Sequence, residues 1–162
     1  MKIGILADTH DHIDNTQYFL EKFYMKDVHL VIFAGDLVSP FAISPFKKVG
    51  IPVKGVFGNN EGERELIRHK FEEVGFKIVE PPLNLKIEEE FISIFHRLPH
   101  PIPDDIDSNI IIFAHTHRRE VKREGGRLLI NPGEVCGWFT GEATAVILSI
   151  PDGEIEWIFK VT

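Results

Sequence analysis

The sequence has one cysteine, Cys136, so no disulfide bond can form within the chain. This agrees with a reducing compartment, where disulfides are rare. No apolar run approaches the roughly 20 residues that span a bilayer, which argues against a membrane protein. No targeting segment is visible either, because Met1-Lys2 runs directly into a predicted strand. We therefore expect a cytoplasmic protein without membrane spans.

An excess of positive charge is also missing. The formal net charge is −7, with 18 Lys and Arg against 25 Asp and Glu. Nucleic-acid-binding surfaces usually carry a basic patch or stripe. The densest basic stretch, residues 118–127, is interrupted by acids and is more typical of a solvated hairpin. The composition thus argues against a nucleic-acid partner.

Internal repeats, low-complexity tracts and domain linkers are absent as well. The chain has 162 residues, of which 43% are hydrophobic and 27% charged. This length is sufficient for one domain with its own core. We predict a single domain over residues 1–162.

What the sequence does contain is a set of short apolar runs, each followed by polar residues. The runs are Ile3–Ala7, Leu30–Ala34, Val53–Phe57, Phe91–Phe95 and Ile110–Ala114. Such runs predict buried strands. The polar clusters that follow them are Asp8-Thr9-His10, Gly35-Asp36, Gly58-Asn59-Asn60, His96 and His115-Thr116-His117. Because ligands bind outside the strand ends of open α/β sheets, we expect these clusters to meet.

Helix and strand signals alternate in the first half of the chain. Helices are predicted after an N-cap at Asp14, from Ser39-Pro40, and over residues 62–74 with Gly75 as the stop. The second half is rich in strand signals, at residues 83–87, 91–95, 110–114, 127–130, 143–150 and 154–161. This order predicts an α/β fold in which helices cover one face of a sheet and a second sheet packs on the other.

The residue types in the clusters suit a pair of divalent metal ions. Two such ions need a bridging carboxylate, and Asp36 is a good candidate because it stands alone at the end of its strand. Asp8 and His10 are two residues apart, so both side chains could leave an extended backbone on the same side. His115 and His117 share this spacing. Oxygen and imidazole ligands without thiolate favour Mn²⁺, Fe²⁺, Co²⁺, Ni²⁺ or Zn²⁺.

Each cluster alone is weak evidence, since a lone histidine at a strand end is more often structural than a ligand. The conjunction of five clusters favours a metal site. In their order along the chain, the clusters resemble the calcineurin-like metallophosphoesterase superfamily. The compact size and the sequence Asn131-Pro132-Gly133-Glu134 resemble its small prokaryotic, YfcE-like phosphodiesterase branch.

The resemblance implies a four-layer α/β sandwich of two mixed β-sheets flanked by helices. One metal ion would bind Asp8, His10, Asp36 and His117, and the other Asp36, Asn59, His96 and His115. It also implies hydrolysis of a small phosphodiester by a metal-bridging hydroxide, supported above all by manganese or nickel. Two such ions lower the pKa of water and neutralise charge on the phosphate.

The chain departs from the family pattern at several positions. Asn60 stands where many members carry a histidine that assists the leaving group, which predicts a preference for good leaving groups. The family usually reads His-Gly-His at the fourth motif, but here Arg97 follows His96. Our hypothesis is that Arg97 binds the substrate phosphate, because a guanidinium can contact two phosphate oxygens. An idle, exposed Arg97 is an equal alternative, and His100 is a further candidate for the missing role.

Two other functions compete with a phosphodiesterase. The same fold serves as a non-catalytic scaffold in the retromer coat, and the altered fourth motif is compatible with that function. A phosphomonoesterase would share the metal site, although Asn60 argues against it. Trp138 and Phe139 are adjacent, and core packing is favoured for them over a subunit contact or base stacking. Family relatives are often homo-oligomers, so an oligomer is a further expectation.

Overall fold

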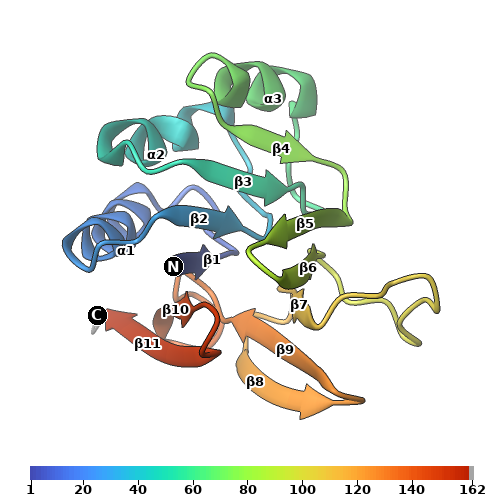
Figure 1. Ribbon diagram of the computed structural model, residues 1–162. Coiled ribbons are helices and arrows are strands. Elements are labelled where there is room, and N and C mark those ends of the chain that lie inside the picture. The colour runs from blue at the N-terminus through green and yellow to red at the C-terminus, as the bar shows by residue number, and fades with distance from the viewer. Residues whose placement is uncertain (161–162) are drawn as a thin grey trace.

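The first of two mixed sheets contains the parallel strands predicted at the start of the chain. The computed structural model describes residues 1–160. The sheet has the strand order β11 (Glu154–Lys160), β10 (Ala143–Ser149), β1 (Lys2–Leu6), β2 (Leu30–Phe33), β3 (Val53–Val56) and β4 (Lys77–Val79). Strands β1 to β4 are mutually parallel, and β10 and β11 join them as an antiparallel pair. Figure 1 shows this order across the molecule.

The second sheet is built entirely from the second half of the chain. Its order is β5 (Leu83–Ile87), β6 (Glu90–Ile94), β7 (Ile110–Ile112), β9 (Arg127–Pro132) and β8 (Arg119–Glu124). Strands β6, β7 and β9 are parallel, and hairpins add β5 and β8 at the two edges. The basic stretch of the sequence forms the β8–β9 hairpin, which confirms that prediction.

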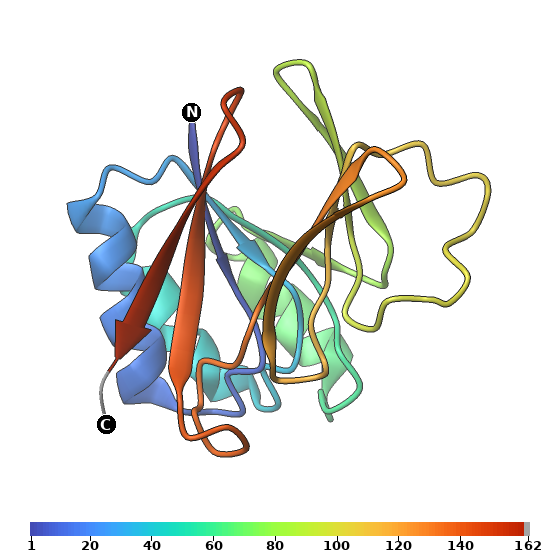
Figure 2. The same cartoon turned by 90° about the horizontal axis from the view of Figure 1, so that it is seen from below.

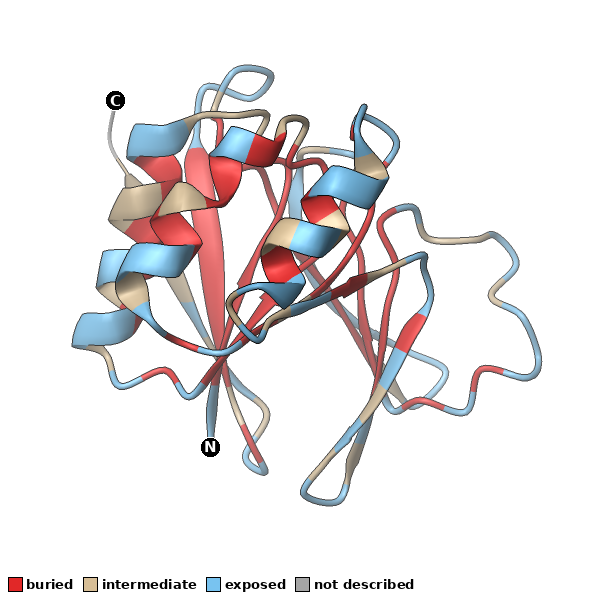
Figure 3. Cartoon of the chain, turned by 90° about the horizontal axis from the view of Figure 1, so that it is seen from above, coloured by how far each residue is buried: buried red, intermediate tan, exposed pale blue. Residues whose placement is uncertain are grey.

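Three helices cover one face of the first sheet. They are α1 (Ile13–Met25), α2 (Ser44–Val49), which continues the 3-10 turn η1 (Pro40–Ile43), and α3 (Arg64–Glu72). Their buried phenylalanines, such as Phe19, Phe46 and Phe71, pack against the sheet. Figure 3 shows that the buried residues of each helix face inward and the exposed ones outward. This is the pattern that an amphipathic helix requires.

The space between the two sheets is a second apolar core. Ile3 and Ile5 of β1 point into it, and so do Ile92 and Ile94 of β6. The residues between them in the sequence point the other way, because side chains alternate along a strand. Burial on both faces explains why β1, β2 and β7 are continuous apolar runs.

A loop rather than a helix forms the outer layer over the second sheet. Ile106, with the half-buried Leu98 and Ile102, packs on Phe95 and Phe113 in a third apolar cluster. The segment contains three prolines that disfavour a helix. The expected α/β fold of two mixed sheets is thus confirmed, and its fourth layer is irregular.

Several local predictions differ from the structure. Helix α1 begins at Ile13 with His12 as the N-cap, not after Asp14, because the His12 ring accepts a hydrogen bond from the Asn15 backbone amide. Strand β4 was not predicted, since it is a three-residue strand at the edge of its sheet. The last predicted strand included Val161, which lies outside the described residues. Within residues 1–160, no helix is both long and apolar enough to cross a membrane.

Candidate metal centre

All five polar clusters lie beyond the carboxyl ends of the parallel strands, at one end of the two sheets, which we call the metal-centre edge. Each begins two or three residues after the end of its strand, as predicted for β1, β2, β3, β6 and β7. The loop after β1 and the loop before β10 lie side by side there, joined by hydrogen bonds from Val135 N to Ala7 O and from Cys136 N to Asp8 O. Figure 2 shows both loops, dark blue and orange, at the lower edge of the molecule. The structure therefore brings residues from distant parts of the chain to one place.

Four of the predicted residues form a compact cluster of oxygen and nitrogen atoms. One side-chain atom from each of Asp8, His10, Asp36 and His117 lies within 4.8 Å of all the others. The Nε2 atom of His10 is 3.6 Å from Oδ2 of Asp36, and Nε2 of His117 is 3.9 Å from Oδ1 of Asp8. These separations suit atoms arranged around a common cation.

The remaining three predicted residues lie on the other side of Asp36. The His96 Nε2 atom is 3.4 Å from Oδ2 of Asp36 and 3.0 Å from Oδ1 of Asn59. The His96 Nδ1–H donates to the carbonyl of Ala34 at 2.8 Å, which directs Nε2 toward this group. The ring centroids of His96 and His115 are 5.2 Å apart. Asp36 therefore stands between two groups of side chains, as a bridging carboxylate would.

The backbone at these positions is left-handed rather than extended. Asp8, His10 and Asp36 have φ angles of 50°, 42° and 64°, and His115 and His117 have 70° and 62°. Residues other than glycine adopt this region rarely, and such strain is concentrated at functional sites. The prediction of an extended backbone was therefore wrong, although the side chains of Asp8 and His10 do converge. Tight turns after the strands bring them together.

Two buried polar atoms in the cluster are unsatisfied. Within residues 1–160, neither Oδ1 of Asp8 nor Nε2 of His10 has a hydrogen-bond partner. Leaving a buried polar group unpaired costs about 1–3 kcal/mol. Burial raises the pKa of Asp8 to about 7, against the attraction of His117 and His96. A cation between these atoms would satisfy both of them, so the donor set fits a divalent metal ion.

Asp36 is much more strongly stabilised as an anion than Asp8. Burial alone would raise its pKa, but the attraction of His96 and hydrogen bonds from Asn60 outweigh burial and keep the pKa well below its usual range. Its Oδ1 accepts from the backbone amides of Asn59 and Asn60 at 2.8 and 3.0 Å. Its Oδ2 accepts from Nδ2 of Asn60 at 2.7 Å. The carboxylate is thus charged and fixed in orientation.

The pKa values of the imidazoles shift in different directions, and the direction depends on how close each ring lies to Asp36. Burial lowers the pKa of His10 and of His115, which favours the neutral ring that can donate a lone pair to a metal. For His96, burial has the same tendency, but the neighbouring Asp36 outweighs it and raises the pKa. The charge on Asp36 therefore favours the protonated form of His96.

Glu61 is a supporting carboxylate that the sequence reasoning did not identify. It is buried, and its Oε1 accepts from the backbone amides of Asp36 and Leu37 at 2.7 and 3.0 Å. Its Oε2 accepts from the amide of Gly58 at 2.8 Å. Glu61 thus joins the loops after β2 and β3. In the sequence, only its position directly after the third polar cluster indicated that Glu61 could lie at the site.

Glu134 supports the opposite side of the site and was also missed. The Nδ1–H of His117 donates to its Oε2 at 2.7 Å, so the Nε2 of His117 is left facing Asp8. Hydrogen bonds from His117, Cys136 and Thr140 overcome the effect of burial and lower the pKa of Glu134 to about 2. Carboxylates that accept from a ligating histidine orient the ring and raise its basicity.

The three residues predicted to contact substrate have different positions. Asn60 is exposed at the site, but its amide is bonded to Asp36. Arg97 is exposed and close enough to His115 for its charge to lower the pKa of that ring. His100 is exposed on the irregular outer loop, and within the described residues it has no hydrogen bond or ion pair to the clusters. The structure therefore gives no support for His100.

The prediction that Trp138 and Phe139 pack in the core is wrong. Their exposed fractions are 65% and 83%. The Trp138 ring lies 6.4 Å from His10 and 5.8 Å from His12, and the Phe139 ring lies 4.7 Å from His117, between centroids. The Gly-rich loop before β10 turns both rings outward, at the rim of the site.

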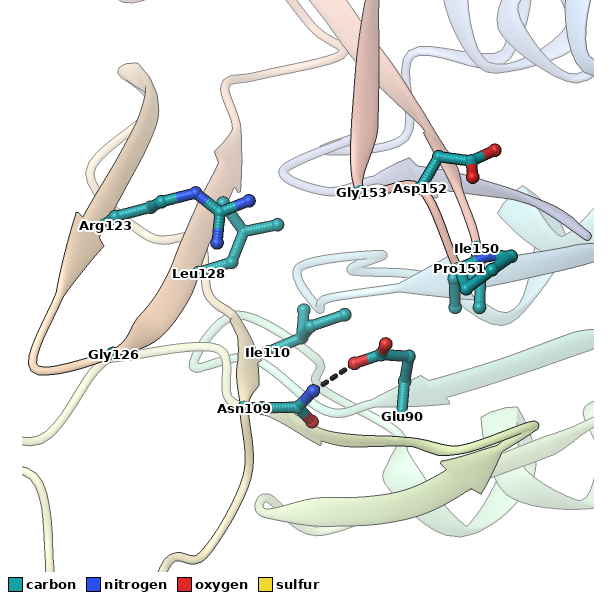
Figure 4. A pocket seen from close by; sticks show the side chains of 10 residues that line it. All are labelled: Glu90, Asn109, Ile110, Arg123, Gly126, Leu128, Ile150, Pro151, Asp152 and Gly153. Carbon is teal, nitrogen blue, oxygen red and sulfur yellow. Dashed lines mark hydrogen bonds between the residues drawn. The ribbon is translucent and has the colours of Figure 1, made fainter.

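A separate cleft of about 160 Å³ lies between the sheets at the opposite end of the strands, which we call the cleft edge. Figure 4 shows Arg123 on one side, the turn at Asp152 on the other, and a hydrogen bond from Asn109 to Glu90 at its base. None of the predicted ligands and no histidine lines this cleft. The chemistry predicted from the sequence is therefore confined to the other edge.

The fold and this arrangement of side chains define a class of metal-dependent phosphoesterases. Residues 1–153 match the family model of the calcineurin-like phosphoesterase superfamily domain, and the chain belongs to this family. A phosphodiesterase of Methanocaldococcus jannaschii is 35% identical, with 91% of this chain and 92% of that protein covered. These findings confirm the resemblance and the expected class of enzyme.

Solved structures agree with this membership. The structure of an archaeal phosphodiesterase matches with a TM-score of 0.92 and 32% identity, covering 99% of this chain and 100% of that one. YfcE, a phosphoesterase from E. coli, matches with a TM-score of 0.77 at 19% identity, covering 98% of each chain. Zinc-bound Vps29 of Entamoeba histolytica has a TM-score of 0.69 at 18% identity, covering 99% of this chain and 98% of that one. At such low identities the last two show the fold alone.

Proposed function

We propose that this chain is a dimetal-dependent phosphodiesterase acting on small phosphodiesters. Asp8, His10, Asp36 and His117 would bind one divalent ion. The second ion would be bound by Asp36 together with the three residues on its other side, Asn59, His96 and His115. When bound, the two ions would activate a water molecule and neutralise charge on the phosphate.

The observation that carries this proposal is the pair of unsatisfied buried atoms within a converging donor set. Oδ1 of Asp8 and Nε2 of His10 have no other partner among residues 1–160, and both face the cluster around Asp36. The family membership and the phosphodiesterase activity named for the relatives support the same function.

The proposed roles of the surrounding residues follow from their positions. Asn60 fixes the orientation of the Asp36 carboxylate, and its neutral amide supplies no acidic proton for a leaving group. We therefore expect diesters with good leaving groups to be hydrolysed best. Arg97, exposed beside His115, would contact the non-bridging oxygens of the phosphate.

The choice of metal follows from ligand chemistry rather than from geometry. Imidazole and carboxylate ligands suit Mn²⁺, Fe²⁺, Co²⁺, Ni²⁺ and Zn²⁺, whereas Mg²⁺ and Ca²⁺ prefer oxygen alone. Cys136 is also near His10 and His117, but burial raises its pKa to about 12, so the thiolate that a metal needs is disfavoured. We propose manganese or nickel as the supporting ions.

The test is hydrolysis of bis(p-nitrophenyl) phosphate by metal-stripped protein, titrated with Mn²⁺, Ni²⁺ and Zn²⁺. We expect turnover that requires metal and that Asp36→Asn abolishes. Asp152→Asn is the matched control, because it removes an exposed carboxylate at the opposite edge. We expect it to retain activity within about twofold, as surface substitutions usually have little effect.

The competing functions give different results in the same experiment. A scaffold would bind metal without turnover, so metal binding alone does not separate it from an enzyme. A phosphomonoesterase would hydrolyse p-nitrophenyl phosphate faster than the diester. Either result would exclude the phosphodiesterase and leave the fold assignment intact.

A further inference from the structure

We infer that Trp138 and Phe139 form an aromatic rim that stacks on a planar group of the substrate, next to the scissile phosphate. This inference rests on the proposed function, because it assigns the substrate class of the same site. The aromatic rim consists of these two side chains only. It would select phosphodiesters that carry an aryl group or a nucleobase over aliphatic ones.

The position of the aromatic rim is the first support. Trp138 lies against His10 and His12, and Phe139 lies against His117, at centroid distances of 6.4, 5.8 and 4.7 Å. His10 and His117 also stack on each other at 5.0 Å and face Asp8 and Asp36. A group esterified to a phosphate at this centre is therefore within reach of both rings.

The fixed conformation of the loop is the second support. Glu134 accepts hydrogen bonds from the backbone amides of Phe139 and Thr140, at 3.0 and 2.6 Å, and from the Thr140 hydroxyl at 2.7 Å. The Asn15 amide donates to the carbonyls of Val135 and Cys136, at 2.9 and 3.3 Å. The exposed rings thus sit on a loop whose base is bonded to the metal-centre edge. Preorganised aromatic side chains stack on ligands at low entropic cost.

The physical chemistry favours a small planar ligand. Large aromatic side chains that stay exposed beside a polar site are the usual platform for stacking, which tolerates any ring with a π-face. The net charge of −7 disfavours a long polyanion. One aromatic group on a small diester satisfies both conditions.

The first experiment compares two inhibitors that share a phosphonate and differ only in a ring, phenylphosphonate and methylphosphonate. Inhibition of bis(p-nitrophenyl) phosphate hydrolysis is measured for the wild type and for the Trp138→Ala/Phe139→Ala double variant. We expect the inhibition constant of phenylphosphonate to rise about tenfold or more in the variant. That of methylphosphonate should change less than about twofold.

The matched control is Phe91→Ala, which removes a half-exposed phenylalanine from the start of β6 at the opposite edge. We expect it to leave both inhibition constants unchanged. Equal weakening of the two phosphonates in the double variant, with metal content intact, would overturn the inference. The result would then indicate a general effect on the centre.

The second experiment needs no turnover. The chain has two tryptophans, so in the Trp157→Phe variant Trp138 is the only one. We expect adenosine 5′-monophosphate to quench its fluorescence saturably in zinc-loaded protein, and ribose 5-phosphate not to. Absence of saturable quenching by the nucleotide would contradict the aromatic rim.

The two experiments separate failure of this inference from failure of the proposed function. If the wild type hydrolyses no diester, the proposed function is wrong. The fluorescence measurement would still show whether the aromatic rim binds the base of a nucleotide. If sedimentation shows that the wild type is a dimer and the double variant a monomer with unchanged inhibition constants, the rings are a subunit contact. That outcome overturns the inference.

Discussion

The two open edges of the sheets contain similar residue types in different physical states. At the metal-centre edge, Asp8 and Asp36 are 0% and 1% exposed, and their backbone is left-handed. At the cleft edge, Asp152 is exposed in a tight turn, and Glu90 is bonded to the exposed Asn109. Both edges therefore contain carboxylates. At the metal-centre edge they are buried, and an oxygen of Asp8 has no hydrogen-bond partner among the described residues.

This difference shows which polar residues need a functional explanation. Exposed charges at a turn are solvated and need none. Buried carboxylates whose atoms lack partners lower the stability of the fold when no metal ion is bound, so they need a functional explanation. Substitutions of matched residues at the two edges should therefore have unequal effects.

Asp8→Asn should stabilise the metal-free protein, because it removes a charge that burial disfavours. The pKa of Asp8 is raised from 3.8 to about 7. A raised pKa means that the ionised carboxylate destabilises the fold: the cost is absent below pH 3.8, grows between pH 3.8 and 7, and is complete above pH 7. We expect a gain of about 2–4 kcal/mol at pH 8 and almost none at pH 4.

Thermal unfolding in a chelating buffer measures this effect. The midpoint should rise by about 5–10 °C at pH 8 for Asp8→Asn. Asp152→Asn should change stability by less than about 0.5 kcal/mol at either pH. An unchanged or lower midpoint for Asp8→Asn at pH 8 would show that the buried carboxylate is not a cost to the metal-free fold.

Gly58→Ala should disrupt the bridging carboxylate. A Cβ atom at Gly58 would lie 2.0 Å from Oδ1 of Asp36 and 2.6 Å from its backbone nitrogen, so the carboxylate must move. We expect kcat/KM to fall about 100-fold, as at sites where support for a metal ligand is lost. Gly126→Ala is the control at the cleft edge. It has open space and a φ of 79°, so its cost is backbone strain of about 1 kcal/mol without loss of activity.

Glu134→Gln should weaken metal binding without removing a proposed ligand. The substitution removes the negative charge that accepts from Nδ1 of His117. We expect metal affinity, measured by calorimetry, to fall about 10-fold or more. Glu90→Gln removes a comparable carboxylate at the cleft edge and should leave affinity unchanged. Equal affinities for both variants would mean that Glu134 serves the loop and not His117.

Arg97→Ala should have the smallest effect, because the side chain is exposed and its interaction with phosphate is screened by solvent. We expect KM for a diester to rise about two- to fivefold with kcat nearly unchanged. Arg123→Ala, at the cleft, should change neither constant. If kcat and KM of Arg97→Ala both match the wild type, the residue has no role in substrate binding.

The sequence was sufficient to predict which residues would meet, for a physical reason. Buried parallel strands are readable as apolar runs, and their ends must lie at one sheet edge, so Asp36 and His96 could be brought together from positions 60 residues apart. The turns that aim the side chains were not readable, since left-handed Asp and His depend on tertiary contacts. For the same reason, the extended-backbone argument for His115 and His117 was wrong.

Supporting residues were harder to predict than the clusters themselves. Glu61 accepts from backbone amides of the distant loop after β2, whereas Glu134 accepts from His117 and from amides of its own loop, and neither pattern has a fixed spacing in the sequence. The outward orientation of Trp138 also depends on the loop held by Glu134, and hydrophobicity alone suggested burial. A cytoplasmic location, a homo-oligomer and a single domain over residues 1–162 stay predictions.

Anomalous diffraction from crystals soaked in Mn²⁺ would show directly whether the clustered side chains bind two metal ions. We expect two manganese peaks about 3.5–4 Å apart, with Asp36 between them and Asp8 and His96 on opposite sides. A single peak, or peaks at the cleft around Glu90 and Asp152, would contradict a two-metal centre at this edge.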